Sequence, residues 1–203
     1  PALVTGNTVV VKTSEVTPLT CARLAQLWTE SDDAALPPPG TYSVITGLGS
    51  TVGAALVSSP LVDIVSMTGS VPTGKAIMKS AAEHMTKVSL ELGGKAPAIV
   101  CADADLELAV KGVLASRITY SGQICISCER VYVHESIKDV FLSKLVAAME
   151  AVKVGAPTDE GVDCCGLVSA FQLEKVTGMV DRAVAGGAKV ECGGAPLANV
   201  HYG

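Results

Sequence analysis

The chain has 203 residues, of which 49% are hydrophobic, and its formal net charge is -5. This length allows one or two domains with a sizeable apolar core. The charged residues form no basic cluster, which excludes the electrostatic footprint of a protein that binds nucleic acid or anionic lipid. No apolar run approaches the ~18 consecutive residues of a membrane span, so we expect a soluble globular protein without a membrane partner.

The first half of the chain alternates short apolar strands with helices. Strands are predicted at residues 8–11, 42–46, 61–67 and 88–92, and a helix follows each of the first three. Short links between strands and helices are typical of right-handed crossovers in a parallel sheet that helices cover on both faces. The predicted fold class is therefore α/β, with a Rossmann-like parallel sheet and flanking helices.

The first of these helices is predicted from its start signal and its apolar spacing. Thr17 is the expected N-cap, and Pro18 suits the first turn. Four residues recur at the i, i+3, i+4, i+7 spacing of one helix face, namely Cys21, Leu24, Ala25 and Trp28. This spacing predicts a helix that faces the core.

Glycine-rich turns precede the next two helices. Gly47, Gly49 and Gly53 have one residue too many for a GxGxxG fingerprint, and such a pattern alone is more often a tight turn with helix packing. A second turn runs from Gly69 through Ser70 to Gly74. Turns of this kind place helix N-termini, with free N–H groups and positive dipole ends, where a pyrophosphate can bind.

The second half of the chain has fewer signals. Strands are predicted at residues 97–101, 130–134 and 189–192, and helices at residues 103–117, 138–152 and 171–185. Asp103 and Asp105 favour the dipole at the start of the first helix. No third ligand follows them at a loop spacing, so no metal site is predicted.

Cys125 lies on the glycine-started connection between helix 103–117 and strand 130–134. Gly122 permits a backbone conformation or a close approach that a side chain would hinder. Successive free backbone N–H groups beside a cysteine can stabilise its thiolate. Because a free thiol titrates near ~8.5, an enzyme that uses one as a nucleophile at neutral pH must supply such help or a base.

Two other interpretations of Cys125 remain open from this loop alone. An unpaired cysteine is often a small buried hydrophobe. Cys125 and Cys128 also form a CxxC pair, which suits a redox or metal site. A zinc site would need a second ligand pair, however, and Cys164 and Cys165 are adjacent rather than spaced as CxxC.

A second candidate group stands upstream, where the strand at residues 88–92 ends. Glu91 is followed by Leu92, the pair Gly93 and Gly94, and Lys95. A glutamate at such a strand end can act as a base toward water, although a solvated strand end is the simpler interpretation.

Together, Glu-Leu-Gly-Gly-Lys at 91–95 and Gly-Gln-Ile-Cys at 122–125 resemble the paired active-site signature of the aldehyde dehydrogenase superfamily. The resemblance extends over essentially the whole chain. Ser66-Met67-Thr68-Gly69-Ser70 and the run 128–133 are most similar to the lactaldehyde and glycolaldehyde dehydrogenase branch. The resemblance implies an NAD-dependent oxidation of a small aldehyde, with Cys125 as nucleophile and Glu91 as the base that activates water.

The resemblance also implies the cofactor-binding residues. Lys12 and Glu15 match residues that meet the adenosine ribose, and Glu15 would repel a 2'-phosphate, which favours NAD over NADP. The segment from Gly69 to Gly74 matches the start of the helix that receives the dinucleotide, with Ser70 near a phosphate. Gly49 and Gly53 complete the predicted cofactor set.

Two residues depart from the family pattern. Many members have proline at the position of Thr13, where it would mainly stiffen the loop. Asparagine is frequent at the position of Tyr120. A bulky ring there would narrow the aldehyde tunnel or shift the nucleophile.

The resemblance implies a partial NAD-binding domain at residues 1–93 and a partial catalytic domain at residues 94–203. Family members are longer, and this chain starts at Pro1 without methionine. We therefore expect a fragment that is inactive alone, from a full-length dimer or tetramer. Seven cysteines without a signal peptide favour a reducing, cytoplasmic location. The alternatives are a silent binding or structural module and a semialdehyde dehydrogenase of the same superfamily.

Overall fold

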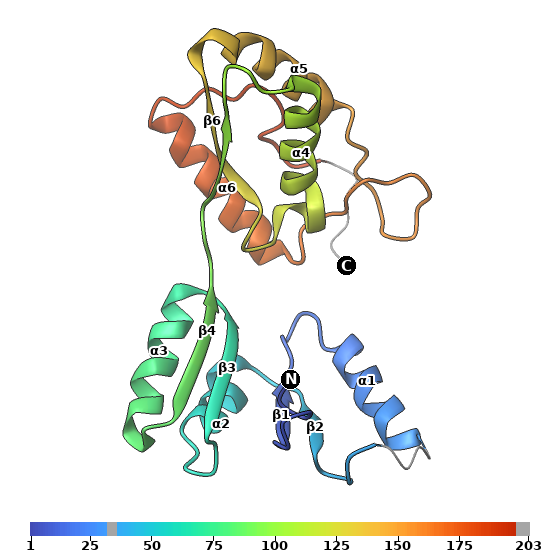
Figure 1. Cartoon of the computed structure of the whole chain (residues 1–203), viewed down its shortest axis with the longest axis vertical. Helices are drawn as coiled ribbons and strands as arrows, with labels where there is room; N and C mark the ends of the chain where they lie inside the picture. Colours follow the sequence, from blue (N-terminus) through green and yellow to red (C-terminus); the bar gives the residue numbers. More distant parts are fainter. Residues whose placement is uncertain (32–35, 198–203) are drawn as a thin grey trace. The chain divides into compact units, whose positions relative to one another are not determined.

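A computed structural model of the chain describes residues 1–31 and 36–197 (Figure 1). The chain divides into two compact units, which we call unit 1 (Pro1–Leu92) and unit 2 (Gly93–Gly203). The division falls one residue before the predicted boundary. No helix in the described residues is long and apolar enough to cross a membrane.

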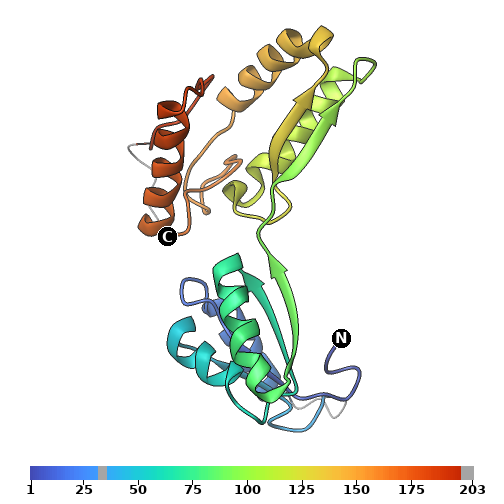
Figure 2. The ribbon, with the colours of Figure 1, turned by 90° about the vertical axis from the view of Figure 1, so that its left-hand side faces the viewer.

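Unit 1 alternates strands and helices. Its elements are β1 (Val9–Lys12), α1 (Leu19–Glu30), β2 (Tyr42–Ile45), the π-helical turn η1 (Gly49–Gly53), α2 (Ala54–Val57), β3 (Ile64–Gly69), α3 (Val71–Ala81), the 3-10 turn η2 (Ala82–His84) and β4 (Lys87–Leu92). β1 pairs with β2 and β3 pairs with β4, both in parallel. α3 packs along the β3–β4 pair (Figure 2).

The predicted α/β class with parallel strands and flanking helices is confirmed, and the structure adds how the strands pair. The described residues of unit 1 form two separate two-stranded sheets. Apolar runs predict that strands exist, whereas the pairing of one strand with another depends on contacts between distant parts of the chain. Residues 61–63, which were predicted to begin the third strand, precede β3.

The start of α1 also differs from the prediction. Pro18 occupies the N-cap position with helical backbone angles, and no side chain caps the helix there. The prediction of Thr17 as N-cap is therefore wrong. The predicted apolar face is only partly covered, because Leu24 is 51% exposed. Trp28 lies with its ring centroid 5.4 Å from that of Tyr42.

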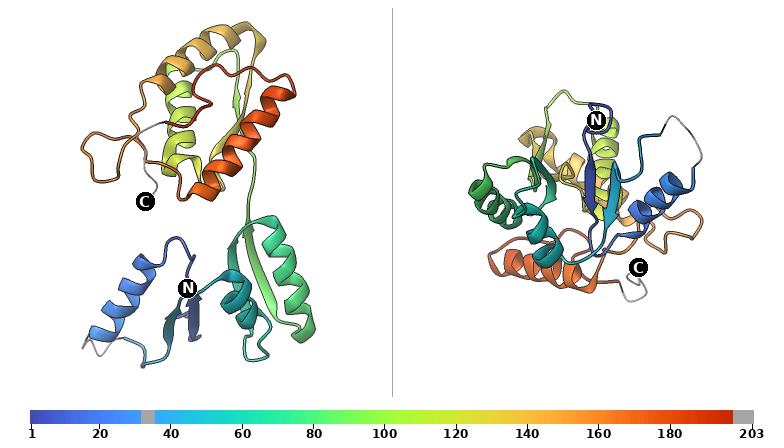
Figure 3. Two further views of the ribbon diagram at one scale, coloured as in Figure 1. Left: turned by 180° about the vertical axis from the view of Figure 1, so that it is seen from behind. Right: turned by 90° about the horizontal axis from the view of Figure 1, so that it is seen from below.

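Unit 2 is built around a third parallel pair. Its elements are β5 (Ala96–Val100), α4 (Leu106–Ile118), the 3-10 turn η3 (Thr119–Gly122), β6 (Cys128–Val133), the 3-10 turn η4 (Glu135–Ile137), α5 (Lys138–Glu150) and α6 (Ala170–Ala185). Asp105 caps α4, where its Oδ1 accepts hydrogen bonds from the Glu107 and Leu108 amides at 3.0 and 3.1 Å. The orange segment between α5 and α6 is an extended loop (Figure 3).

The strand predicted at residues 189–192 is wrong. These residues pair with no strand in the described part of unit 2, and the chain there is irregular. Gly193 and Gly194 follow with φ of 64° and 78°, a conformation that does not continue an extended strand. The apolar content of this short run was not enough to make it a strand without a partner.

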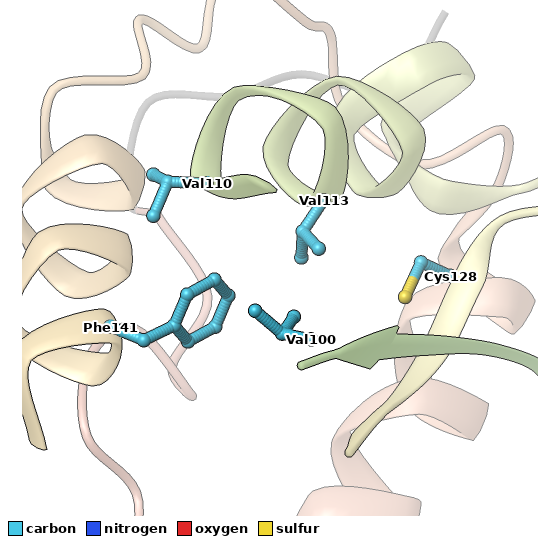
Figure 4. Close-up of a cluster of buried hydrophobic side chains, with 5 residues drawn as sticks. All are labelled: Val100, Val110, Val113, Cys128 and Phe141. Atoms are coloured by element: carbon cyan, nitrogen blue, oxygen red, sulfur yellow. The ribbon is translucent and has the colours of Figure 1, made fainter. Parts of the chain in front are cut away.

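The core of unit 2 joins β5, α4, β6 and α5. Its buried side chains are Val100, Val110, Val113, Cys128 and Phe141, which point toward one another (Figure 4). Val113 in the middle of α4 and Cys128 at the start of β6 are both in this cluster. The core therefore anchors the helix before the connection that carries Cys125 and the strand after it.

Candidate active site

Residues 119–127, which we call the nucleophile loop, leave α4 after Ile118 and enter β6 at Cys128. Three consecutive residues in this loop have positive φ: Tyr120 at 49°, Ser121 at 57° and Gly122 at 73°. Residues other than glycine in this conformation cost of order 1 kcal/mol or more each, so the loop persists only if its surroundings hold it. Tyr120 itself is 77% exposed.

Hydrogen bonds to the segment before α6 hold one side of the nucleophile loop. The Ser121 hydroxyl donates to the Cys165 carbonyl oxygen at 2.7 Å. The Gln123 side chain accepts from the Val168 amide at 3.1 Å and donates to the Tyr120 carbonyl oxygen at 3.1 Å. The bonds to Cys165 and Val168 connect residues more than 40 positions apart in the chain.

Cys125 is exposed, unlike Cys128, which is buried in the core. The interpretation of Cys125 as a buried hydrophobe is therefore wrong, and the two sulfurs of the CxxC pair occupy different environments. Within residues 1–31 and 36–197, neither the Cys125 nor the Ile126 amide has a hydrogen-bond acceptor. Two successive N–H groups are thus available to an anion at the exposed thiol.

Arg117 contacts both ends of the nucleophile loop from the last turn of α4. Its Nη2 donates to the Gly122 carbonyl oxygen at 3.2 Å, and its Nη1 donates to the Cys128 carbonyl oxygen at 3.3 Å. A Cβ added to Gly122 would overlap Nη2 and lie 2.7 Å from Cζ. Glycine at position 122 therefore makes room for the guanidinium, in addition to permitting positive φ.

Glu129 joins Arg117 to Lys95, the residue that ends the Glu-Leu-Gly-Gly-Lys run. Its Oε1 lies 3.3 Å from Arg117 Nη1, and its Oε2 lies 2.7 Å from Lys95 Nζ. The Lys95 hydrogen bond, with a smaller contribution from Arg117, lowers the pKa of Glu129 although partial burial opposes this. A Cβ added to Gly94 would lie 3.3 Å from the Cys125 carbonyl oxygen.

These supporting residues were missed in the sequence. An arginine at a helix C-terminus is common because its charge interacts favourably with the helix dipole. The presence of Arg117 therefore did not indicate a second role. Lys95 and Glu129 belong to the two runs that were singled out, yet their pairing across 34 positions is visible only in the fold.

Glu91 lies at the next-to-last position of β4, opposite Thr68 of β3. It is exposed, and in the described part of the chain its carboxylate forms neither a hydrogen bond nor an ion pair. The next side chain, Leu92, packs instead beneath α3, where it lies 2.9 Å from a Cβ added to Gly74. The alternation of the strand therefore sends the carboxylate to the face opposite α3.

Unit 1 brings Lys12 and Glu15 together with the turn that holds Gly49 and Gly53. Lys12 Nζ lies 3.2 Å from Glu15 Oε2 and donates to the Gly47 carbonyl oxygen at 3.1 Å. The pKa of Glu15 is lowered by its own backbone N–H, then by Lys12, and further by the Gly49 N–H. Nothing lies within 4 Å of a Cβ added to Gly49.

The turn from Gly69 to Gly74 starts α3. Ser70 is the N-cap, and its Oγ accepts from the Thr73 amide at 3.3 Å and lies 2.9 Å from the Thr73 hydroxyl. Gly74 is buried against Leu92, so its direct effect is to let α3 approach β4. The residues predicted to bind the cofactor thus fall into two groups, the Lys12 and Glu15 group and the Ser70 turn. In the described residues, no group of three or more His, Cys, Asp or Glu side chains could hold a metal ion.

Comparison with known proteins places this chain among aldehyde dehydrogenases. Residues 1–202 match the aldehyde dehydrogenase family. Lactaldehyde dehydrogenase of Escherichia coli K12 is 48% identical over 203 residues, which cover all of this chain and 42% of that enzyme. Its crystal structure superposes with a TM-score of 0.94 over 99% of this chain.

Two further solved structures are similar to the chain. Betaine aldehyde dehydrogenase of Staphylococcus aureus in complex with NAD+ is 39% identical, with a TM-score of 0.92 over 98% of this chain and 38% of that one. A 3,6-anhydro-L-galactose dehydrogenase in complex with NAP is 41% identical, with a TM-score of 0.91 over 99% of this chain and 42% of that one. The chain spans about two fifths of the length of these relatives. By sequence and by structure, it belongs to the aldehyde dehydrogenase family.

Proposed function

We propose that the complete protein oxidises a small aldehyde to its carboxylate with NAD, and that lactaldehyde or glycolaldehyde is the substrate. The observation that carries this proposal is the exposed Cys125 thiol, which lies on a braced loop beside two backbone N–H groups that have no acceptor among the described residues. The similarity to the lactaldehyde dehydrogenase of E. coli supports a short hydroxyaldehyde. Unit 1 would hold the cofactor, and unit 2 carries the nucleophile.

Cys125 would start the reaction. Its thiolate adds to the carbonyl carbon, so a carbon–sulfur bond forms and the carbonyl oxygen becomes an oxyanion. The amides of Cys125 and Ile126 lie on either side of the Cα that carries the sulfur, and they can donate to negative charge that develops there. Because these donors are part of the backbone, a braced loop holds them in place before substrate arrives.

The residues of unit 1 fit a dinucleotide. The Glu15 carboxylate, kept ionised by its neighbours, can accept hydrogen bonds from ribose hydroxyls, and Lys12 is a flexible donor beside it. Gly49 leaves open space at the same turn, and Ser70 at the start of α3 would face a phosphate. The chemistry that NAD supplies when bound is acceptance of a hydride, which leaves a thioester on Cys125.

Glu91 would complete the reaction. Its carboxylate is exposed, and within the described ranges it is not neutralised by a partner, so it is available to take a proton from water. The resulting hydroxide attacks the thioester carbonyl, releases the carboxylate product and returns the thiol. The assembly of the complete protein as a dimer or tetramer and its cytoplasmic location remain predictions.

Three variants of the full-length protein test these roles. Cys125→Ala should abolish aldehyde-dependent NADH production and the fastest iodoacetamide labelling, whereas Cys101→Ala, which alters another exposed cysteine, should not. Glu91→Gln should release a burst of NADH and then turn over slowly, because only hydrolysis of the thioester is impaired. Aldehyde-dependent activity in Cys125→Ala would contradict the role of Cys125 as nucleophile. Unchanged steady-state turnover in Glu91→Gln would contradict the role of Glu91 as base.

A further inference from the structure

We propose that Arg117 is a positioning residue that holds the nucleophile loop in its reactive shape, and that Glu129 and Lys95 hold Arg117 in turn. This inference rests on the proposed role of Cys125. Arg117 makes no contact with the Cys125 thiol in the described part of the chain, so it would act through the loop.

The first argument is the geometry of the guanidinium. Its two terminal nitrogens donate to carbonyl oxygens at residues 122 and 128, three positions on either side of Cys125. A planar guanidinium offers several N–H donors in a rigid fork, which suits two acceptors at once. A lysine ammonium is a single point charge on a flexible stem and cannot reproduce this arrangement.

The second argument is the conformation that must be held. Tyr120 and Ser121 have positive φ without being glycine, so the loop lies above its conformational minimum. Ser121 and Gln123 are tied to Cys165 and Val168, but those bonds reach only the first half of the loop. Arg117 joins Gly122, in the first half of the loop, to Cys128, which follows the second half as the first residue of β6.

The third argument is the support behind Arg117. Glu129 lies between Arg117 and Lys95, at 3.3 and 2.7 Å, and the Arg117 side chain is only 36% exposed. A carboxylate between two cations fixes the orientation of the guanidinium, because rotation would break the ion pair. Lys95 follows Gly94 directly, and Gly94 itself lies against the Cys125 carbonyl oxygen. The Glu-Leu-Gly-Gly-Lys run thus ends in a support for the nucleophile loop.

The test compares Arg117→Ala and Arg117→Lys with the control Arg182→Ala in the full-length protein. Arg182 lies on α6 in the same unit and forms no ion pair in the described residues. Arg117→Ala should lower kcat about 100-fold, with a much smaller change in the KM for aldehyde, because a misplaced nucleophile affects the chemical step. Arg117→Lys should fall between Arg117→Ala and the unmodified protein, and Arg182→Ala should match the unmodified protein.

Two further measurements separate positioning from a general loss of structure. Iodoacetamide should alkylate Cys125 at an altered rate in Arg117→Ala, and guanidinium added to that variant should partly restore both the rate and kcat. If Arg117→Ala does not fold, Glu129→Gln replaces it. That variant keeps both hydrogen bonds from Arg117 to the carbonyl oxygens of residues 122 and 128, and it should lower kcat less than Arg117→Lys does.

Unchanged kcat and alkylation in folded Arg117→Lys and Glu129→Gln would overturn the proposal. An equal loss of kcat in Arg182→Ala would also overturn it, because the loss would then not be specific to the arginine that contacts the loop. The alkylation rate of Cys125 is measured without aldehyde or NAD. If the full-length protein does not oxidise aldehydes, the proposed function is wrong. The change in the alkylation rate of Cys125 on substitution of Arg117 would still test the positioning role of Arg117.

Discussion

The glycine turn beside Lys12 and Glu15 in unit 1 and the nucleophile loop in unit 2 are built in opposite ways. In unit 1, a Cβ added to Gly49 would meet nothing within 4 Å, and Glu15 is exposed. In unit 2, a Cβ added to Gly122 would overlap the Arg117 guanidinium. The turn in unit 1 is open, whereas the backbone of the nucleophile loop is held by side chains of unit 2, although Tyr120 and Cys125 are exposed.

This difference teaches that a glycine in a motif can serve either a ligand or the fold. In the described structure, no neighbouring atom requires a glycine at position 49. A glycine there leaves the surface beside the turn open to a ligand. Gly122 is required by its φ of 73° and by Arg117, whatever binds nearby. A flexible group such as a dinucleotide suits an open turn, whereas a nucleophile requires a fixed position.

The most direct test of this difference is to substitute each of the two glycines separately. Gly122→Ala should lower the free energy of unfolding by about 1–3 kcal/mol, because it adds strain at positive φ and displaces Arg117. It should also lower kcat about 100-fold. Gly49→Ala should change the free energy of unfolding by less than about 0.5 kcal/mol. Urea unfolding and steady-state kinetics of the two full-length variants measure these effects.

Equal stabilities of the two variants would show that the nucleophile loop is not held more tightly than the turn in unit 1. A larger loss in Gly49→Ala would reverse the comparison.

Much of the fold could be predicted from the sequence, because its signals are local. The alternation of apolar strands and helices, the carboxylates at the start of α4 and the glycines before α3 all depend on near neighbours. The strand predicted at residues 189–192 failed for the opposite reason, and the pairing of the unit 1 strands as two separate pairs could not be foreseen. A strand requires a partner, and the sequence pattern of one segment does not identify the other.

The candidate site shows the same division. Cys125 and Gly122 could be singled out as candidates because the residues that mark them are close together in the sequence. Arg117 could not, since its acceptors are backbone carbonyl oxygens, which every residue has. The sequence also did not predict that Cys125 and Cys128 differ so much in burial, because burial depends on the core that α4 and α5 form with β6.

The two ionised carboxylates extend the comparison. Glu15 in the open region should select the cofactor, because its charge repels a 2'-phosphate. Glu15→Gln should narrow the preference for NAD over NADP, and it also frees Lys12 to attract the phosphate. The ratio of kcat/KM for the two cofactors measures this effect. Glu30→Gln, which removes a carboxylate from an exposed ion pair on α1, is the matched control. An unchanged ratio in Glu15→Gln would contradict the role of Glu15.

Glu129, which supports the nucleophile loop through Arg117, should affect the free energy of unfolding rather than the choice of cofactor. Its effect should depend on pH. Its pKa is lowered from the ordinary 4.5, first by the Lys95 hydrogen bond and less by Arg117, so folding favours the ionised form. The stabilisation is therefore present above the unfolded pKa and is lost as pH falls through the folded pKa. Glu129→Gln should be less stable than the unmodified protein at neutral pH by at most about 1 kcal/mol, since solvent reaches the pair.

The difference between the two proteins should shrink as pH falls below the ordinary pKa of 4.5, and it should disappear once pH is below the lowered pKa of Glu129 in the folded protein. Urea unfolding across this range measures it, and Glu174→Gln on α6, whose carboxylate forms no ion pair in the described residues, corrects for the loss of a charge. A difference that persists unchanged at low pH would mean that the side chain of Glu129 stabilises unit 2 through its shape. The link from Lys95 to Arg117 would then not depend on charge.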